Sequence, residues 1–365
     1  MRLSVPNIPS SILAIASQRN APSISTPEAV QRIASFLSSG RAAVLTGAGV
    51  SVDSGVKAYR GKDGRYMNPD YKPIFYQELI EDSPRGHSFR QRYWLRAYIG
   101  FLPVRRTLPN PTHFAIAALQ RAGIVGPLIT QNVDGLHHAA LRHALTETEV
   151  DARILELHGS IFKVHCQHGH VYPRAVFQER LGQANPRWHA YLSELERTGS
   201  QPRQIPMAMY VVVVLDESVS YDDFVVPDCP DCNAEGRRNR SCALPTCYFM
   251  KPDFVFFGET ISQVVKDRSY SIVEDADRLF ILGTTLATYS AFRLLKHALE
   301  LRKPVLYLNV GPTRADGLPG VDKLDIRTGT VMTDVVHAGT QARNDPVLRD
   351  MLLSGVVKPH VEDEQ

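Results

Sequence analysis

The chain has 365 residues, of which 44% are hydrophobic and 22% charged. This composition supports a packed core and excludes collagen-like, coiled-coil and low-complexity classes. The 41 basic and 38 acidic side chains leave a net charge of +3 without a long run of one sign, so we expect no nucleic-acid partner. No apolar run approaches the roughly 20 residues of a membrane helix, so we expect a soluble protein without a membrane partner.

The first 27 residues differ in composition from the rest of the chain. They contain no acidic residue, and Arg2 and Arg19 lie among serines and apolar residues. Such an arginine-containing, serine-rich segment is typical of a mitochondrial transit peptide, and a disordered tail is the alternative. We therefore expect residues 1–27 to be a transit peptide or tail, and the protein to lie in the mitochondrial matrix.

Helical and strand patterns alternate after this segment. Thr26, Pro27 and Glu28 form a helix start, with an N-cap, a proline at the first position and an acid in the first turn. An apolar run at residues 42–45 then indicates a buried parallel strand. Similar runs lie at residues 128–130, 254–257, 279–282 and 305–308, with helical patterns such as 111–121 and 291–302 between most of them. This alternation predicts an α/β protein with a doubly wound, Rossmann-like parallel sheet.

Two stretches interrupt the alternation. Residues 63–103 have the pattern of loop and helices, and residues 160–250 carry the cysteines. We expect them to form a smaller inserted domain made of a helical module and a zinc module. The Rossmann-like domain then takes in residues 28–62, 104–159 and 251–345, and residues 346–365 form a C-terminal tail.

A glycine-rich turn follows the first expected strand. Gly47, Ala48 and Gly49 come where a backbone without side chains can approach a pyrophosphate. The third glycine of the usual dinucleotide fingerprint would fall at position 52, which is Val52, so this is not a dehydrogenase motif. A turn that needs glycine only for its own backbone geometry is the alternative.

Polar residues follow a second expected strand. Gln131, Asn132 and Asp134 come after residues 128–130, at the sheet edge where doubly wound folds bind ligands. His158 lies beside a glycine just before the cysteine-containing insertion. A lone histidine is usually structural, but one that follows this amide and carboxylate cluster is a candidate general base.

With these motifs the chain resembles the sirtuins, a family of NAD-dependent protein lysine deacylases. The resemblance covers roughly residues 28–340, and residues 90–94 and 309–314 are most similar to the class II, mitochondrial ADP-ribosyltransferase or lipoamidase type. The motifs are Gly47-Ala-Gly-Val-Ser51, Thr130-Gln-Asn-Val-Asp-Gly-Leu-His137, Leu157-His-Gly159, Phe256-Phe-Gly-Glu259, Gly283-Thr-Thr-Leu286 and Asn309-Val-Gly311.

The resemblance implies NAD as the cofactor and acylated proteins as the substrates. In sirtuins the acyl-lysine oxygen displaces nicotinamide from the ribose, and the acyl group passes to the ribose. The resemblance makes His158 the general base for the ribose hydroxyl and Asn132 the residue that orients the ribose, so these two are the expected catalytic residues. The expected NAD-binding residues are Gly47, Ala48, Gly49, Tyr59, Arg60, Gln131, Asn132, Asp134, Gly283, Thr284, Asn309 and Gly311.

The resemblance also implies a substrate site. Phe257 and Gly258 are expected to offer an edge strand to the substrate peptide. Tyr93 and Arg96, three residues apart on an expected helix, match a pair that binds acidic acyl groups in some sirtuins, whereas an arginine on a solvated helix face is the alternative. One departure from the family is Ala58, which stands where a carboxylate is usual and bears on loop closure over the cofactor.

Cysteines indicate a structural zinc site. Cys229 and Cys232 form a C-x₂-C pair, which is half of such a site. Sirtuins provide a second pair after the His-Gly motif, and here Cys166 stands at its first position while Gly169 replaces the second cysteine. We expect zinc bound by Cys166, Cys229, Cys232 and His168, and the alternatives for the fourth ligand are His170, Cys242 and Cys247.

These expectations add up to an enzyme, an NAD-dependent protein lysine deacylase that transfers the acyl group to ADP-ribose with release of nicotinamide. Two alternatives stay open: a protein mono-ADP-ribosyltransferase, and a catalytically weak NAD-binding regulatory protein. The intact Asn132, Asp134 and His158 argue against a catalytically silent protein.

Overall fold

A computed structural model describes residues 7–18, 24–59, 64, 73–199, 204–207, 210–213, 223–236, 248–340 and 344–358. The chain forms two compact units. Unit 1 takes in Met1–Val5, Asn68–Arg106 and Gly159–Thr260, and unit 2 takes in Pro6–Met67, Thr107–His158 and Ile261–Gln365. The sequence pattern placed the corresponding main boundaries after residues 62, 103, 159 and 250.

A six-stranded parallel sheet forms the centre of unit 2. Its strands are β1 (Ala42–Thr46), β2 (Val125–Thr130), β3 (Ile154–Glu156), β9 (Arg278–Leu282), β10 (Val305–Leu308) and β11 (Val321–Leu324). They lie in the order β11-β10-β9-β1-β2-β3, and every neighbouring pair is parallel. This is the strand order of dinucleotide-binding folds, so the expected doubly wound sheet is confirmed.

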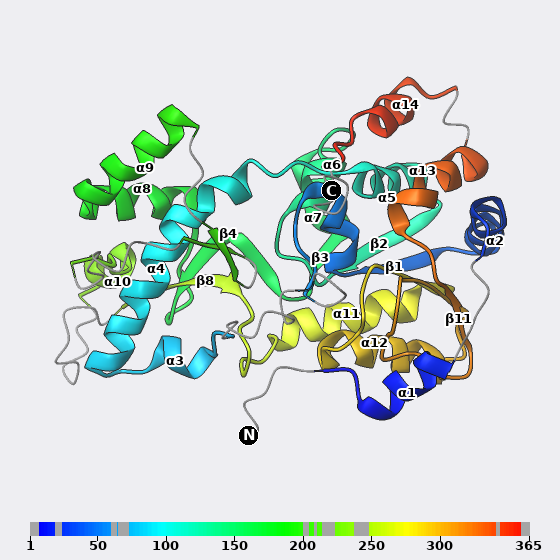
Figure 1. Cartoon of the computed structure of the whole chain (residues 1–365), viewed down its shortest axis with the longest axis horizontal. Helices are drawn as coiled ribbons and strands as arrows, with labels where there is room; N and C mark the ends of the chain where they lie inside the picture. Colours follow the sequence, from blue (N-terminus) through cyan, green and yellow to red (C-terminus); the bar gives the residue numbers. More distant parts are fainter. Residues whose placement is uncertain are drawn as a thin grey trace. The chain divides into compact units, whose positions relative to one another are not determined.

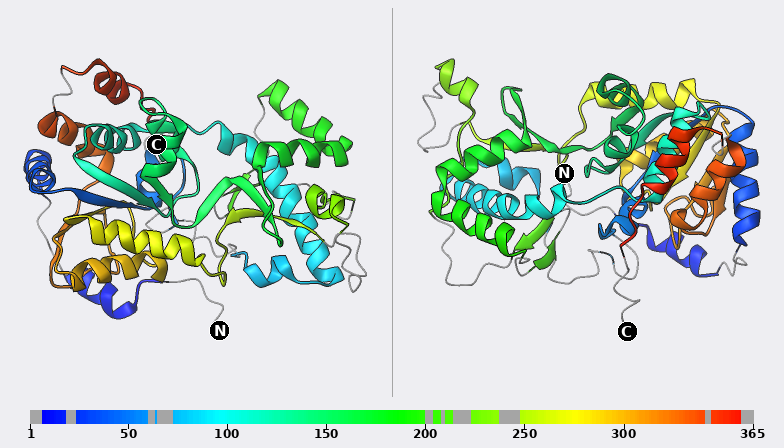
Figure 2. Two further views of the ribbon diagram at one scale, coloured as in Figure 1. Left: turned by 180° about the vertical axis from the view of Figure 1, so that it is seen from behind. Right: turned by 90° about the horizontal axis from the view of Figure 1, so that it is seen from above.

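Helices cover both faces of this sheet (Figure 1). One face packs against α2 (Thr26–Ser38), α5 (Pro111–Arg121) and α13 (Thr328–Gly339), and the other against α11 (Gln263–Asp275) and α12 (Tyr289–Glu300). Successive residues of β1 alternate between the faces: Val44 lies in the first core, whereas Ala43 and Leu45 lie in the second. Both views of unit 2 in Figure 2 show the same two helical layers.

The remaining helical segments of unit 2 are short. They are α1 (Ser10–Gln18), the 3₁₀ helix η1 (Ala48–Ser54), α6 (Leu136–Leu141), α7 (Glu147–Arg153) and α14 (Pro346–Leu353). No helix in the described ranges is both long and apolar enough to cross a lipid bilayer.

Unit 1 combines helices with two small sheets. Its helices are α3 (Tyr76–Ile80), α4 (Pro84–Arg105), α8 (Arg174–Ala184), α9 (Pro186–Thr198) and α10 (Pro230–Ala234). Strands β4 (Gly159–Cys166), β5 (Val171–Pro173) and β8 (Met250–Phe254) form an antiparallel sheet in the order β5-β4-β8, and β6 (Gln204–Met207) pairs with β7 (Tyr210–Val213). Trp94 of α4 is fully buried, packs on Phe177 and donates from Nε1 to the Met250 carbonyl over 3.0 Å, which ties α4 to this sheet.

Three details of the expected fold are wrong. Residues 254–257 are not a strand of the parallel sheet: Phe254 ends the antiparallel β8, and the run is apolar because Phe254 and Phe256 pack together with ring centroids 4.4 Å apart. The N-cap of α2 is Ser25 rather than Thr26, since its side chain accepts from the backbone N–H of Glu28. Strands β3 and β11 were not expected, because they are only three and four residues long and lie at the sheet edges.

Candidate active site

The glycine-rich turn at the end of β1 packs against the turn at the end of β9. Gly47 N–H donates to the Leu282 carbonyl over 3.2 Å, and Gly49 N–H donates to the Gly283 carbonyl over 2.7 Å. A Cβ on Gly49 would lie 2.7 Å from the Gly283 oxygen, and a Cβ on Gly47 would lie 2.6 Å from the Thr284 side chain. The close approach of the two turns therefore requires these glycines. Gly47 is the N-cap of the 3₁₀ helix η1, and Gly49 lies within it.

These two turns lie at the point where the strand order of the sheet reverses. From β1 the chain moves to β2 on one side, whereas β9, on the other side of β1, is followed by β10 farther out. Ligands of doubly wound folds bind at this crevice, beyond the carboxyl ends of the strands. Asn309 and Gly311 follow β10 at the same edge, and Asn309 N–H donates to the Leu324 carbonyl over 3.2 Å.

The amide of Gln131 connects three of the turns. Its Nε2 donates to the Thr46 carbonyl over 3.1 Å and to Thr284 Oγ1 over 2.9 Å. Its Oε1 accepts from Thr288 Oγ1 over 3.1 Å. Gln131 therefore fixes the ends of β1, β2 and β9 relative to one another, which is a structural contribution that the sequence did not indicate.

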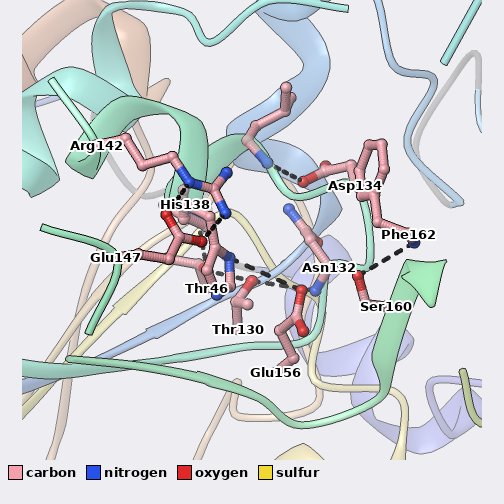
Figure 3. A network of polar contacts seen from close by, with 12 residues as sticks. Thr46, Thr130, Asn132, Asp134, His138, Arg142, Glu147, Glu156, Ser160 and Phe162 are labelled. Atoms are coloured by element: carbon pink, nitrogen blue, oxygen red, sulfur yellow. Dashed lines mark hydrogen bonds and ion pairs between the residues drawn. The ribbon is translucent and has the colours of Figure 1, made fainter. Parts of the chain in front are cut away.

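Asn132 and Asp134 converge on the hydroxyl of Ser51, a residue that the sequence analysis did not single out for the site. Asn132 Nδ2 donates to Ser51 Oγ over 3.1 Å and to the Gly47 carbonyl over 3.2 Å. Ser51 Oγ donates to Asp134 Oδ2 over 2.8 Å, and Leu136 N–H donates to Asp134 Oδ1 over 3.1 Å. Figure 3 labels Asn132 and Asp134 and shows the hydrogen bond from the Asn132 N–H to Thr130. Burial raises the pKa of Asp134, and the hydrogen bonds from Leu136 and Ser51 oppose that rise.

Behind Ser51 lies a second residue that sequence reasoning missed, His113. Its ring is fully buried, with Nε2 3.2 Å from Ser51 Oγ, and burial lowers its pKa to about 3. Its Nδ1 lies 3.2 Å from the backbone N and 3.0 Å from Oδ1 of Asn110. The sequence signal was the run Asn110-Pro111-Thr112-His113, in which an N-cap and a proline start α5 and the histidine closes a capping box.

His158 is held at both ring nitrogens. Its Nδ1 lies 3.2 Å from the Gln131 carbonyl oxygen, and its Nε2 lies 2.8 Å from the Ser290 hydroxyl. Burial lowers the pKa of His158 to about 4, the Gln131 carbonyl opposes this, and Arg293 lowers it further. The ring is therefore neutral at pH 7, which is the state that a general base requires.

Tyr59 and Arg60, two of the expected cofactor residues, follow η1 in the chain. Tyr59 lies within the described residues and Ala48 begins η1, but Arg60 lies outside the described residues. The predicted role of Arg60 in closing over the cofactor stays a prediction.

The residues of unit 2 fit NAD. Close-packed glycine turns and partly or fully buried amide, hydroxyl and carboxylate groups meet at the switch point of a six-stranded dinucleotide-type sheet. The groups that would hold it are Gly47, Gly49, Gln131, Asn132, Asp134, Gly283, Thr284 and Asn309.

Unit 1 contains a cluster of four metal-binding side chains: Cys166, His170, Cys229 and Cys232. The Nδ1 atom of His170 lies 3.4 Å from the sulfurs of Cys166 and Cys232 and 3.5 Å from that of Cys229, and the sulfurs of Cys166 and Cys232 are 3.7 Å apart. A tetrahedral zinc ion with Zn–S of about 2.3 Å and Zn–N of about 2.05 Å separates its ligands by about 3.5–3.8 Å. The donor set and its spacing fit a Cys₃His zinc site.

The expectation that His168 is the fourth ligand is wrong. Cys166 and His170 face each other across the turn between β4 and β5, because Cys166 N–H donates to the His170 carbonyl over 3.1 Å and Gly169 takes a positive φ of 87°. His168 lies in the turn itself, where its ring packs on Tyr248 with centroids 5.6 Å apart. The alternatives Cys242 and Cys247 lie outside the described residues.

The expected acyl-binding pair lies on α4. Tyr93 is only 6% exposed, with its ring packed edge-on against Trp94 and Phe256. Its hydroxyl is buried, has no hydrogen-bond partner among the described residues, and has a pKa raised by burial. Arg96, one helical turn later, is half-buried. A buried hydroxyl without a partner is a group that a polar ligand can satisfy.

The expected peptide-binding edge is already partly paired. The Phe257 carbonyl accepts from Tyr76 N–H over 2.9 Å, and the Gly258 carbonyl accepts from Gln77 Nε2 over 3.4 Å. Gly258 has a φ of 82°, and a Cβ there would lie 2.7 Å from Gln77 Oε1. Each of these two carbonyls therefore already has one hydrogen-bond donor within unit 1.

The sequence model of the Sir2 family matches residues 47–290, which is more than half of the chain. The chain therefore belongs to the Sir2 family, the sirtuins, and the resemblance seen in the motifs is confirmed. With the family, the expectation of an enzyme that is an NAD-dependent protein deacylase is confirmed as well.

Individual relatives agree with this assignment. The NAD-dependent protein deacylase SIR4 of Batrachochytrium dendrobatidis is 36% identical over 81% of this chain and 89% of its own length. The NAD-dependent protein lipoamidase sirtuin-4, mitochondrial, of Bos taurus is 35% identical over 84% of this chain and 85% of its own length. A solved Sir2–p53 peptide–NAD⁺ complex has the same fold, with a TM-score of 0.56 and 22% identity over 85% of this chain and 98% of that one.

Proposed function

We propose that this sirtuin removes acyl groups from protein lysines with His158 as its general base. The observation that carries the assignment is the ring of His158, which is neutral at pH 7 and held at Nδ1 by the Gln131 carbonyl. This ring lies in the same unit as the paired glycine turns and the Asn132–Ser51–Asp134 cluster.

Bound NAD supplies a ribose carbon from which nicotinamide leaves, and ribose hydroxyls that receive the acyl group. Asn132 orients the ribose through the part of its amide that Ser51 and the Gly47 carbonyl leave unused. Asp134, fixed by Ser51 and Leu136, binds the nicotinamide amide. His158 accepts the proton of the ribose hydroxyl and becomes a cation, which the Gln131 carbonyl stabilises.

The test is the release of nicotinamide and of deacylated peptide by the purified protein with acetyl-, lipoyl- and glutaryl-lysine peptides. We expect His158→Ala to lose deacylation by about 10²–10⁴-fold, the usual contribution of a general base, and to keep its NAD affinity. His337→Ala, at an exposed histidine of α13, is the matched control. Full deacylation by His158→Ala would contradict the assignment, and nicotinamide release without deacylated peptide would favour mono-ADP-ribosyl transfer.

We also propose that Tyr93 and Arg96 bind the polar or acidic end of an acyl group. Tyr93→Phe removes only the hydroxyl that has no partner among the described residues, so the variant should fold at least as stably as the parent. We expect a loss of about tenfold in kcat/KM for a glutaryl-lysine peptide, equivalent to one hydrogen bond to a charged group, and little change for an acetyl-lysine peptide.

Arg92→Gln is the matched control for this prediction, because Arg92 is exposed on the same helix. An equal loss for both peptides in Tyr93→Phe would indicate that the tyrosine acts only in packing.

The mitochondrial matrix is the proposed location. Residues 1–27 are rich in serine and contain no acidic residue, which supports this location. The relative in Bos taurus is named a mitochondrial protein. Fusion of residues 1–27 to a fluorescent protein tests it: import into mitochondria is expected, and a diffuse signal would contradict it.

A further inference from the structure

Both ring nitrogens of His158 have a protein partner. Nδ1 lies 3.2 Å from the Gln131 carbonyl oxygen, and Nε2 lies 2.8 Å from Ser290 Oγ. Ser290 belongs to the first turn of α12, which begins at Tyr289 after the N-cap Thr288. The nitrogen that must receive a proton from a substrate is therefore already hydrogen-bonded to a serine.

The direction of these two hydrogen bonds follows from the chemistry of the partners. A carbonyl oxygen only accepts, so Nδ1 of His158 carries the ring proton and donates it to Gln131. The lone pair of the neutral ring is then on Nε2, and the Ser290 hydroxyl donates to it. Among the described contacts of Ser290, no donor occupies the lone pairs of Oγ.

We propose that Ser290 is a catalytic residue that carries the proton from the substrate hydroxyl to Nε2 of His158. The inference rests on the proposed function, in which His158 is the general base. Ser290 is only partly buried, and in the proposed step its hydroxyl contacts a substrate hydroxyl as well as the ring. No side-chain to backbone hydrogen bond within α12 competes for it among the described contacts of Ser290.

The step moves two protons and leaves the serine unchanged. The O–H bond of the substrate hydroxyl breaks, and its proton forms a new O–H bond with Ser290 Oγ. At the same time the original Ser290 proton leaves Oγ and forms an N–H bond with Nε2 of His158. The substrate oxygen gains the electron pair for attack, and His158 becomes an imidazolium that donates to Gln131 and back to Ser290, a stronger charge-assisted pair.

Substitution of Ser290 tests the relay in the full chain. We expect Ser290→Ala to slow deacylation by about 10–100-fold, below the full loss of His158→Ala because a water molecule can partly replace the hydroxyl. Ser290→Thr keeps a hydroxyl on the same carbon and is expected to recover most of this loss. NAD affinity, measured by calorimetry, should stay within about twofold in both variants.

The number of protons that move in the reaction step distinguishes a relay through Ser290 from a role of Ser290 in packing. In mixtures of H₂O and D₂O, the deacylation rate of the parent should fall along a curved line, as expected for two moving protons. Ser290→Ala should give a straight line or a different curvature. A parent with a straight line, or Ser290→Ala with the parent rate, would overturn the relay.

A measurement without substrate or NAD completes the test. Nitrogen-15 spectra of the free protein report which ring nitrogen of His158 carries the proton, and we expect Nδ1. A proton on Nε2 would overturn the relay even if Ser290→Ala did not fold. Full deacylation by His158→Ala would instead overturn the proposed general base itself, so the two failures are distinguishable.

Discussion

Ser51 is the residue on which the polar cluster of unit 2 depends. The Nε2 atom of the buried His113 lies 3.2 Å from Ser51 Oγ, and its Nδ1 lies 3.2 Å from the backbone N and 3.0 Å from Oδ1 of Asn110. The Ser51 proton is directed to Asp134, and the Ser51 oxygen also accepts from the Asn132 amide. A buried histidine is thus part of the cluster that holds the Asn132 amide and the Asp134 carboxylate.

The buried His113 makes stability depend on pH. Its folded-state pKa of about 3 lies below the ordinary value of 6.5. The unfolded chain therefore binds a proton that the folded chain cannot bind once the pH falls below 6.5, so stability is complete above that pH and is lost as the pH falls towards 3. At about 1.4 kcal/mol per pH unit, His113 alone removes about 2 kcal/mol at pH 5.

Urea unfolding at pH 7.5 and pH 5 tests this, with His113→Gln as the variant that cannot titrate. We expect the parent to lose about 2 kcal/mol more than His113→Gln between the two pH values. His337→Gln, at an exposed position, should lose as much as the parent. The same loss in the parent and in His113→Gln would show that His113 is protonated in the folded state.

At the scale of elements, the contact between the turns after β1 and β9 permits no side chain. A Cβ at Gly49 would lie 2.7 Å from the Gly283 oxygen, whereas a Cβ at Gly339, the last residue of α13, would lie 3.8 Å from Ile124. We expect Gly49→Ala to destabilise the chain by about 2 kcal/mol or more, because two turns must separate. Gly339→Ala should stabilise it by about 0.5 kcal/mol.

Thermal unfolding of the two alanine variants measures this difference, and NAD affinity shows whether it reaches the cofactor region. Equal stability of Gly49→Ala and the parent would mean that the turns tolerate a greater separation than the packing indicates.

The hairpin of β4 and β5 brings His170, and not the neighbouring His168, into the cluster that fits zinc. We expect His170→Ala to lower zinc affinity by more than the roughly 10–100-fold that loss of an outer hydrogen-bond partner costs. His168→Ala is the matched control, two residues away in the same turn, and should keep the affinity of the parent. Competition with a chelator, followed by metal analysis, measures both. Retention of zinc by His170→Ala would contradict the Cys₃His assignment.

Elements with strong local signals could be predicted from the sequence, and those defined by tertiary contacts could not. Helix α5 runs from Pro111 to Arg121 as expected, because Asn110 and Pro111 fix its start. The prediction that residues 254–257 form a strand of the parallel sheet was wrong. An apolar run indicates that its side chains are buried, but it does not indicate which element buries them. The choice between His168 and His170 depended on which residue faces Cys166 across a turn, and spacing alone does not determine this.

For the whole molecule, the same limit applies to the active-site cluster. The motif residues Gly47, Asn132, Asp134 and His158 were recognisable because each follows a strand at the ligand-binding edge. Ser290 and His113 were missed because each is an ordinary helix residue until the fold brings it against His158 or Ser51.

The position of β1 between β2 and β9 has a consequence for protein synthesis. β2 begins at Val125, but β9 begins only at Arg278, after the whole of the second insertion has been translated. At about 5–20 residues per second, one backbone edge of β1 stays without its partner strand for roughly ten to fifty seconds of synthesis. A nascent chain of this sirtuin therefore has an unpaired strand edge for most of its synthesis, and during this time the edge can pair wrongly with another chain.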